Sequence, residues 1–258
     1  MALIFIMKLY DKIMFYITVP KCVGCGEKLN IEDRALCQEC SDEYKDNLYL
    51  NCSICAKPLN YCICTNDYLD AHYVHKVVKV YRYHTDRRIS SNNLIYSLKR
   101  DNRKDVVDFL SDELSQAIKS GIKNPESYLF TSVPRRRSEI VKYGMDHAEV
   151  LAKKVAKQLG AKYEKMLISK AKNAQKKSAN ISERFKNAKF ELKNKNADIK
   201  GQNIIIIDDI ITTGASMGMA AVLLKAAGAG RIVAAAVSIA YKDPFVKLDT
   251  NDRFFSKK

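Results

Sequence analysis

The segment from Ile204 to Ser216 has the residue types that bind a sugar phosphate. It begins with four isoleucines, continues with the carboxylates Asp208 and Asp209, and ends in a Thr-Thr-Gly turn that leads into an apolar helical pattern. Amide groups at the start of a helix bind anions, and hydroxyl groups add further donors to a phosphate. Two adjacent carboxylates can each accept a hydrogen bond from one hydroxyl of a ribose diol.

The alternative for this segment is that both acids only cap the helix. A Thr-Thr-Gly turn directly after the acids favours a ligand site instead, because the glycine lets the backbone approach a phosphate closely. The predicted site contains Asp208, Asp209, Thr212, Thr213, Gly214, Ala215 and Ser216.

Eight cysteines form four closely spaced pairs within residues 22–64, and the remaining chain has none. Close pairs suit tetrahedral Zn²⁺ because one tight turn presents two sulfurs to the same ion. A disulfide framework is the alternative. It is disfavoured because a secretory signal has its positive charges before the apolar run, whereas here the charges follow the apolar N-terminal stretch. Without secretion the thiols would stay reduced in the cytosol. Zinc is therefore the expected partner, and a cytoplasmic location is expected with it.

Consecutive pairing predicts two structural sites with no open position for catalysis. The second set closes with a less usual Cys-x-Cys spacing, so one or two zinc ions are expected. The predicted ligands are Cys22, Cys25, Cys37 and Cys40 for the first ion, and Cys52, Cys55, Cys62 and Cys64 for the second.

The rest of the chain has the alternating pattern of an α/β domain. Apolar strands separated by amphipathic helices imply a parallel sheet covered on both faces. We expect a cysteine-rich domain at residues 1–70 and an α/β domain at 71–258. Strands are expected at 77–83, 128–133, 165–168, 203–207 and 232–239, helices at 93–99, 104–118, 146–159 and 214–227, and a long exposed loop at 169–200 with a helical turn at 182–187.

The net charge of +15 is unevenly distributed. Residues 1–70 carry 7 Lys or Arg against 10 Asp or Glu, so the excess of positive charge lies in the α/β domain. A solvated lysine-rich surface is one explanation, and a phosphate-bearing partner is the other. No apolar run approaches the roughly 18 residues that a transmembrane helix needs, so no membrane span is expected.

The run from Ile204 to Ser216 resembles the phosphoribosyl diphosphate (PRPP) motif of the type I phosphoribosyltransferases. The segment from Pro20 to Gly26, with its first cysteine pair, and the polar pattern from Lys172 to Phe190 extend the resemblance to the ComF family of competence-associated proteins. That family implies a type I phosphoribosyltransferase fold, with a parallel sheet, flanking helices and a flexible hood, preceded by a small cysteine-rich zinc ribbon.

The resemblance also implies further ligand residues. The run from Ser132 to Arg137 is similar to the loop that holds pyrophosphate in this fold, although three arginines can also form a solvated patch. Asp208 and Asp209 would be the catalytic acids, stabilising a cation-like ribose. The implied substrate-binding residues outside the Thr-Thr-Gly segment are Val133, Pro134, Arg135, Arg136, Lys99, Gln175 and Arg184.

The chain departs from the ComF pattern at two positions. Lys142 stands where an arginine is expected, and a lysine also replaces the arginine expected before Gln175. Because lysine cannot form a planar bidentate fork, anion contacts there should be weaker. The departures therefore bear on the efficiency of transfer more than on binding.

Two functions remain open at this point. One is a phosphoribosyltransferase-like protein that binds PRPP with Mg²⁺ and acts in DNA uptake during natural transformation, with an acceptor and an oligomeric state that the sequence does not identify. The other is a non-catalytic PRPP sensor or an accessory protein that binds single-stranded DNA or DNA-uptake proteins. No nucleotide-binding Gly-x4-Gly-Lys loop is present, which argues against an ATP-driven motor.

Overall fold

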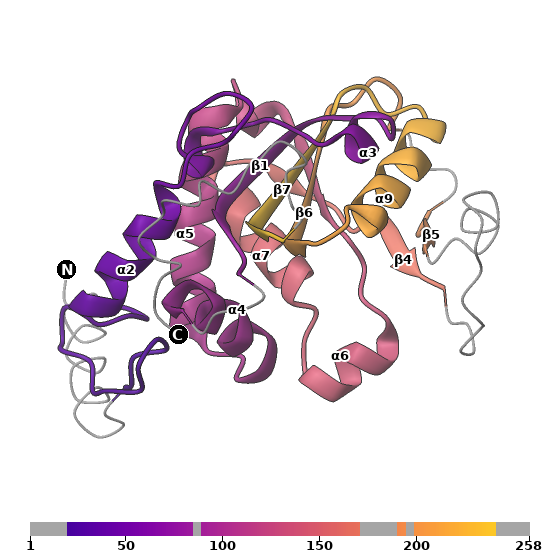
Figure 1. Cartoon of the computed structure of the whole chain (residues 1–258). Helices are drawn as coiled ribbons and strands as arrows, with labels where there is room; N and C mark the ends of the chain where they lie inside the picture. The colour runs from indigo at the N-terminus through magenta and orange to yellow at the C-terminus, as the bar shows by residue number, and fades with distance from the viewer. Residues whose placement is uncertain (1–19, 85–88, 171–189, 195–198, 241–258) are drawn as a thin grey trace, which may run out of the picture.

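The computed structural model describes residues 20–84, 89–170, 190–194 and 199–240 (Figure 1). The apolar N-terminal stretch, the helical turn expected at 182–187 and the predicted ligand residues Gln175 and Arg184 lie outside these ranges.

The centre of the molecule is a sheet of five parallel strands in the order β1-β7-β6-β2-β3. Strands β6 and β7 pair from Ile204 opposite Ile232 to Ile211 opposite Ile239. The first four isoleucines of β6 are fully buried, as expected for a central strand covered on both faces. The strands are β1 (Val74–Arg82), β2 (Leu129–Ser132), β3 (Lys162–Tyr163), β6 (Ile204–Ile211) and β7 (Ile232–Ile239).

Helices cover both faces of this sheet, as Figure 1 shows. One face packs against α4 (Ser90–Arg100), α5 (Lys104–Gly121) and α7 (His147–Gln158). The other face packs against α9 (Ala215–Ala226) and the short α3 (Asp67–Asp70). The predicted class, a parallel sheet with flanking helices after a cysteine-rich segment, is therefore confirmed.

The cysteine-rich segment packs onto both faces of the sheet. It contains α2 (Gln38–Leu48) and the 3-10 turn η1 (Leu59–Tyr61). Cys22 joins the core on the α5 face, whereas Cys52 and Cys62 join the core on the α9 face. The segment therefore wraps around β1, which is an edge strand. The expected boundary between residues 70 and 71 stays a prediction.

Several elements differ from the sequence expectations. Helix α2 lies where only cysteine-punctuated loops are expected, because its mainly polar sequence has little apolar periodicity. Helix α6 (Arg137–Tyr143) follows the arginines directly and buries none of its residues. Within the loop expected at 169–200, β5 (Phe190–Leu192) pairs antiparallel with β4 (Leu167–Ser169), and Phe190 is buried. The 3-10 turn η2 (Pro125–Ser127) precedes β2.

Strand β6 is longer than the sequence predicts. The expected strand ends at residue 207, where pairing with β2 also ends. Pairing with β7 continues through Asp208 to Ile211. Asp208 and Asp209 therefore lie in the part of β6 that is paired with β7 but no longer paired with β2.

In the described ranges, no helix is both long enough and apolar enough to cross a membrane.

Candidate functional site

The predicted residues of the runs 133–136 and 208–216 lie at the carboxyl ends of β2 and β6, which are neighbours in the sheet. After β6 the chain passes through α9 on one face to reach β7, and after β2 it passes through α7 on the other face to reach β3. The two connections diverge, so this is a topological switch point, where open parallel sheets bind ligands. The fold alone thus brings together two segments that lie about seventy residues apart in the chain.

Residues Thr212–Ser216, which we call the threonine loop, comprise the connection after β6 and the first two residues of α9. Thr212 and Thr213 are exposed, and Gly214 is the N-cap of α9, with φ of +80°. Because glycine has no side chain, the N-cap residue itself makes no side-chain hydrogen bond to the first turn of α9. The hydroxyl of Thr213 accepts from the amide of Ala215 at 3.3 Å. The loop therefore presents hydroxyl groups beside the start of a helix, which is an arrangement suited to phosphate.

Helix α3 packs against this loop and the start of α9. A methyl group placed on Gly214 would lie 3.0 Å from Cγ of Leu69, which is fully buried. Asn66 caps α3 by accepting from the amide of Leu69 at 2.8 Å. Since Asn66 follows Cys64 by two residues, the second cysteine cluster is connected directly to the element that contacts the threonine loop.

Asp209 forms a buried ionic cluster with two cations. Its carboxylate pairs with Nη2 of Arg135, and its other oxygen lies 3.1 Å from Nζ of Lys99 in α4. Only 3% of the Asp209 side chain is exposed, against 15% for Arg135 and 30% for Lys99. The structure therefore joins three predicted site residues that come from three separate parts of the chain.

Asp208 has a different environment. Successive strand residues point to opposite faces, so Asp208 follows the α9 face of β6 while Asp209 follows the α5 face. The amide of Asp209 donates to Asp208 at 2.8 Å, and in the described residues no cation pairs with Asp208. Burial, with the nearby charge of Asp209, raises the pKa of Asp208 to about 8. Asp208 is therefore mainly protonated near neutral pH before a cationic ligand arrives.

The three consecutive arginines have separate roles. Val133 and Pro134 are buried as the chain leaves β2, and the amide of Val133 donates to the carbonyl of Ile207 at 3.0 Å. Arg135 turns inward to Asp209, whereas Arg136 and Arg137 are exposed at the start of α6. Of the two arginines predicted to bind diphosphate, only Arg135 contacts the acids.

The sequence did not predict a buried hydrogen-bond network that lies near Arg135. His147, at the start of α7, is fully buried, and its Nε2 lies 2.9 Å from Oδ1 of Asn102. Asn102 in turn donates to the carbonyl of Tyr143 at 2.7 Å. Burial and the charge of Arg135 lower the pKa of His147 to about 4, so its imidazole is neutral. The left-handed backbone of Asn102, with φ of 51°, could not be read from the sequence.

Both predicted cysteine sets are assembled. Within each set of four, the sulfur atoms lie within 4.8 Å of one another, and all eight cysteines are free thiols. The consecutive pairing predicted from the spacing is confirmed. The amide of Cys37 donates to the sulfur of Cys22 at 3.3 Å, and the amide of Cys64 donates to that of Cys62 at 3.3 Å. Four converging sulfurs with amide donors fit a tetrahedral thiolate-binding ion such as Zn²⁺.

The tight turns at residues 22–27 and 52–57, which we call the first and the second knuckle, have the same backbone hydrogen bonds. In the first, Cys22 donates to Glu27 at 2.7 Å and accepts from Gly26 at 2.9 Å; in the second, Cys52 donates to Lys57 and accepts from Ala56, both at 2.8 Å. Gly26 and Ala56 both have positive φ, of 84° and 55°. This internal repeat, offset by thirty residues, is visible in the sequence only once the shared turn is known.

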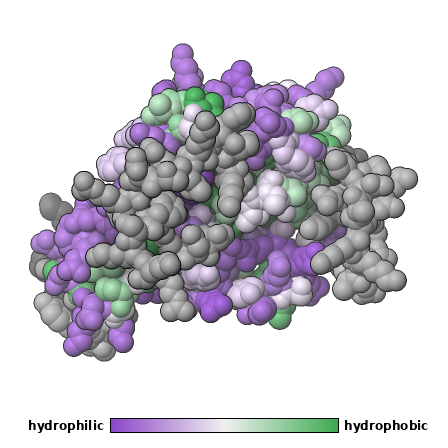
Figure 2. Space-filling model, in the orientation of Figure 1, coloured by the Kyte–Doolittle hydropathy of each residue, from purple (hydrophilic) through white to green (hydrophobic). Residues whose placement is uncertain are grey.

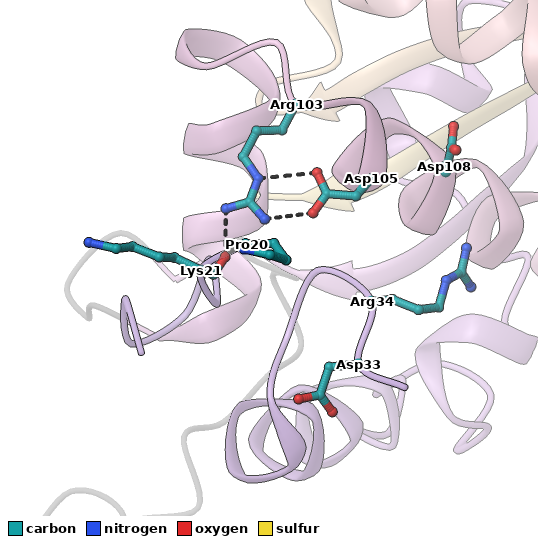
Figure 3. Close-up of a pocket in the computed structure, with 7 residues that line it drawn as sticks. All are labelled: Pro20, Lys21, Asp33, Arg34, Arg103, Asp105 and Asp108. Atoms are coloured by element: carbon teal, nitrogen blue, oxygen red, sulfur yellow. Dashed lines mark hydrogen bonds and ion pairs between the residues drawn. The ribbon is translucent and has the colours of Figure 1, made fainter. Parts of the chain in front are cut away.

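A cavity of about 460 Å³ lies away from the sheet edge, between the first cysteine segment and the start of α5 (Figure 3). Its basic and acidic groups neutralise one another. The guanidinium of Arg103 binds both oxygens of Asp105 and the carbonyl of Lys21, which lies 2.7 Å from Nη1. Arg34 pairs with Asp112. We interpret this cavity as a seam that joins the cysteine segment to α5, because its two arginines, Arg34 and Arg103, are already paired with acids.

The exposed apolar side chains of the described residues gather mainly in one part of the chain. In the orientation of Figure 2, the described surface is mainly hydrophilic along its lower part, where Figure 1 shows α6. Six of the nine exposed large hydrophobic residues fall within residues 49–73, around the second cysteine cluster. Few basic residues accompany them there, so they do not form the basic aromatic groove that single-stranded nucleic acid requires.

Part of the α/β domain matches a known protein family. Residues 145–256 match the family model described as a phosphoribosyl transferase domain. The match includes the two acids and the threonine loop, and it begins after Arg135. No curated protein sequence matches the chain.

Several solved structures resemble the chain at low identity. The phosphoribosylpyrophosphate synthetase from Mycobacterium smegmatis is 19% identical over 54% of this chain and 35% of that one, with a TM-score of 0.31. The adenine phosphoribosyltransferase from Thermoanaerobacter pseudethanolicus is 15% identical over 54% of this chain and 82% of that one, with a TM-score of 0.37. The glutamine phosphoribosylpyrophosphate amidotransferase from B. subtilis is 16% identical over 58% of this chain and 28% of that one, with a TM-score of 0.37.

Proposed function

We propose that the chain binds PRPP at the ends of β2 and β6 and is a phosphoribosyltransferase-like protein. One observation carries the proposal. The threonine loop, the two acids and Arg135 meet at the topological switch point, and the family match covers the first two of these.

The two loops would divide the ligand between them. The threonine loop would hold the 5-phosphate through its hydroxyl groups and the amides at the start of α9. Arg135 and the backbone around Val133 would hold the diphosphate. The diphosphate must compete with Asp209 for Arg135, and Lys99 would then remain as the partner of that buried carboxylate.

The two acids would have different tasks. Asp208, which pairs with no cation in the described residues, would accept from the ribose hydroxyls and lie beside the Mg²⁺ that accompanies PRPP. Asp209 would hold Lys99 and Arg135 in place. When bound, Mg²⁺ neutralises charge on the diphosphate. Once Mg²⁺ is bound, Asp208 would lose its proton, and its negative charge would stabilise a cation-like ribose as pyrophosphate departs.

The resemblance to the ComF family leads us to propose a role in DNA uptake during natural transformation. The acceptor of the phosphoribosyl group is not specified by any residue described here, so transfer and simple sensing of PRPP share this site. Zinc in both cysteine clusters is part of the same proposal.

The two parts of PRPP, ribose 5-phosphate and pyrophosphate, can be used separately to test which loop binds which part. The full chain would be titrated calorimetrically with ribose 5-phosphate and, separately, with magnesium pyrophosphate. Thr213→Val should weaken ribose 5-phosphate and leave pyrophosphate unchanged, and Arg135→Met should do the reverse. Binding of neither half-ligand to the unmodified protein, or equal loss of both in each variant, would overturn the proposed arrangement.

A further inference from the structure

Lys79 is a buried lysine in the middle of β1. It pairs across the sheet with Ala236 of β7, and only 2% of it is exposed. Among the described residues, Lys79 is the only lysine or arginine that is buried. Lysine is almost never fully buried unless its charge is compensated, so the ammonium group needs an explanation.

No carboxylate supplies that compensation in the described ranges. The Nζ atom donates to the carbonyl of Cys64 at 2.6 Å and approaches that of Val77 at 3.3 Å. Neutral carbonyls orient the ammonium but do not cancel its charge. An uncompensated buried cation is strongly unfavourable, so an anionic group must lie nearby.

The second cysteine cluster is the available source of negative charge. Cys62 is 1% exposed, and Cys64 provides the carbonyl that the ammonium binds. Four thiolates around one divalent cation carry a net charge of roughly −2. A disulfide or four neutral thiols would leave the lysine without a counter-charge.

Among the residues that the structure describes, no buried lysine lies in or beside the first cluster. Cys25 is exposed there, so water can solvate part of the thiolate charge. The second cluster is more deeply buried, with Cys52 and Cys62 both in the core of the α9 face. The difference in burial explains why only the second cluster would need a counter-charge from the protein.

We propose that Lys79 is the counter-charge of the second metal centre, a positioning residue that strengthens metal binding through Cys62 and Cys64. The same contact fixes the metal centre to β1. It also explains how a strand of the sheet can carry a lysine among valines without weakening the fold.

The test uses the zinc-loaded full chain and compares Lys79→Met, Lys79→Arg and the control Lys76→Met, which changes a partly exposed lysine of the same strand. Zinc transfer to a chromogenic chelator should show two phases. In Lys79→Met, the zinc affinity reported by one phase should fall by about 10- to 100-fold, which is the usual effect of losing a group that hydrogen-bonds to a metal ligand. The other phase reports the first cluster and should not change, while Lys79→Arg should recover most of the loss.

Melting of the loaded and metal-stripped proteins separates charge from packing. Lys79→Met should lower the melting temperature of the loaded protein and raise that of the stripped protein, because removing an uncompensated buried charge is stabilising. Cobalt substitution adds a direct readout, since loss of the nearby cation should shift half of the thiolate-to-cobalt absorption to longer wavelength. Two unchanged release phases, or lower melting temperatures in both states, would refute the proposal.

Discussion

Arg135 donates from Nη2 to the carboxylate of Asp209, and this ion pair joins the loop after β2 to strand β6. Lys99 holds the other oxygen of the same carboxylate at 3.1 Å. One acid is therefore already neutralised by the protein, while its neighbour Asp208 has a raised pKa. The asymmetry means that substitutions of the two acids should have different effects.

Replacing Arg135 by Met should destabilise the unliganded chain by about 1–3 kcal/mol, because it removes one of two partners of a buried carboxylate. Arg136→Met is the matched control: this side chain is exposed and should change the stability by less than about 0.5 kcal/mol. Urea unfolding measures both. Equal effects of the two substitutions would show that the ion pair does not stabilise the fold.

Replacing Asp208 by Asn should stabilise the unliganded chain, increasingly so as the pH rises. The folded pKa of about 8 lies above the usual value of 3.8, so between these values the unfolded chain loses a proton that the folded chain keeps. Stability is therefore lost as pH rises through this window, and Asn removes that loss. Melting curves from pH 4 to 8 should diverge from those of the unmodified protein, whereas exposed Asp101→Asn should follow them. Parallel curves for Asp208→Asn would contradict the raised pKa.

The sequence predicts the principal strands and helices well because their apolar patterns are strong. Strand β7 and helix α7 match their predicted positions to within one residue at each end, and both cysteine sets assemble as the spacing indicates. Patterns of this kind depend on local periodicity, which a single chain displays directly.

Other features depend on contacts that local patterns do not contain. Helix α2 is polar and is shaped by its packing against α4 and β1. The pairing of Arg135 with Asp209 joins positions 74 residues apart, and the contact of Lys79 with Cys64 joins strand β1 to the cysteine segment. A residue list could name the site, but only the fold shows which of its charges cancel.

Replacing Gly214 by Ala should raise the dissociation constant for PRPP, in addition to lowering the stability of the fold. The new methyl group would press on Leu69 at 3.0 Å and move the threonine loop. Gly201→Ala is the matched control, since Gly201 also has positive φ, of 74°, but has nothing within 4 Å of the added methyl. Both variants should lose about 1 kcal/mol of stability from backbone strain, and only Gly214→Ala should raise the dissociation constant. If calorimetry gives the same constant for both, Leu69 does not position the loop.

Replacing Ala56 by Gly should stabilise the second knuckle. Ala56 has φ of 55°, a region that costs an alanine about 1–2 kcal/mol and glycine almost nothing. The reverse change, Gly26→Ala in the first knuckle, should destabilise by a similar amount, because φ there is 84° and the methyl meets no atom within 4 Å. Thermal melting of the zinc-loaded chain compares the two. Changes of the same sign would contradict the shared backbone construction.

The most direct test of PRPP binding is calorimetric titration of the zinc-loaded chain with magnesium PRPP, beside the variant in which Asp208 and Asp209 are both Asn. The account predicts saturable binding of one PRPP per chain, with the affinity falling at least tenfold in the variant while circular dichroism shows that it is folded. Absence of binding to the unmodified chain, or equal affinity in the folded variant, would contradict the assignment of this sheet edge as a PRPP site.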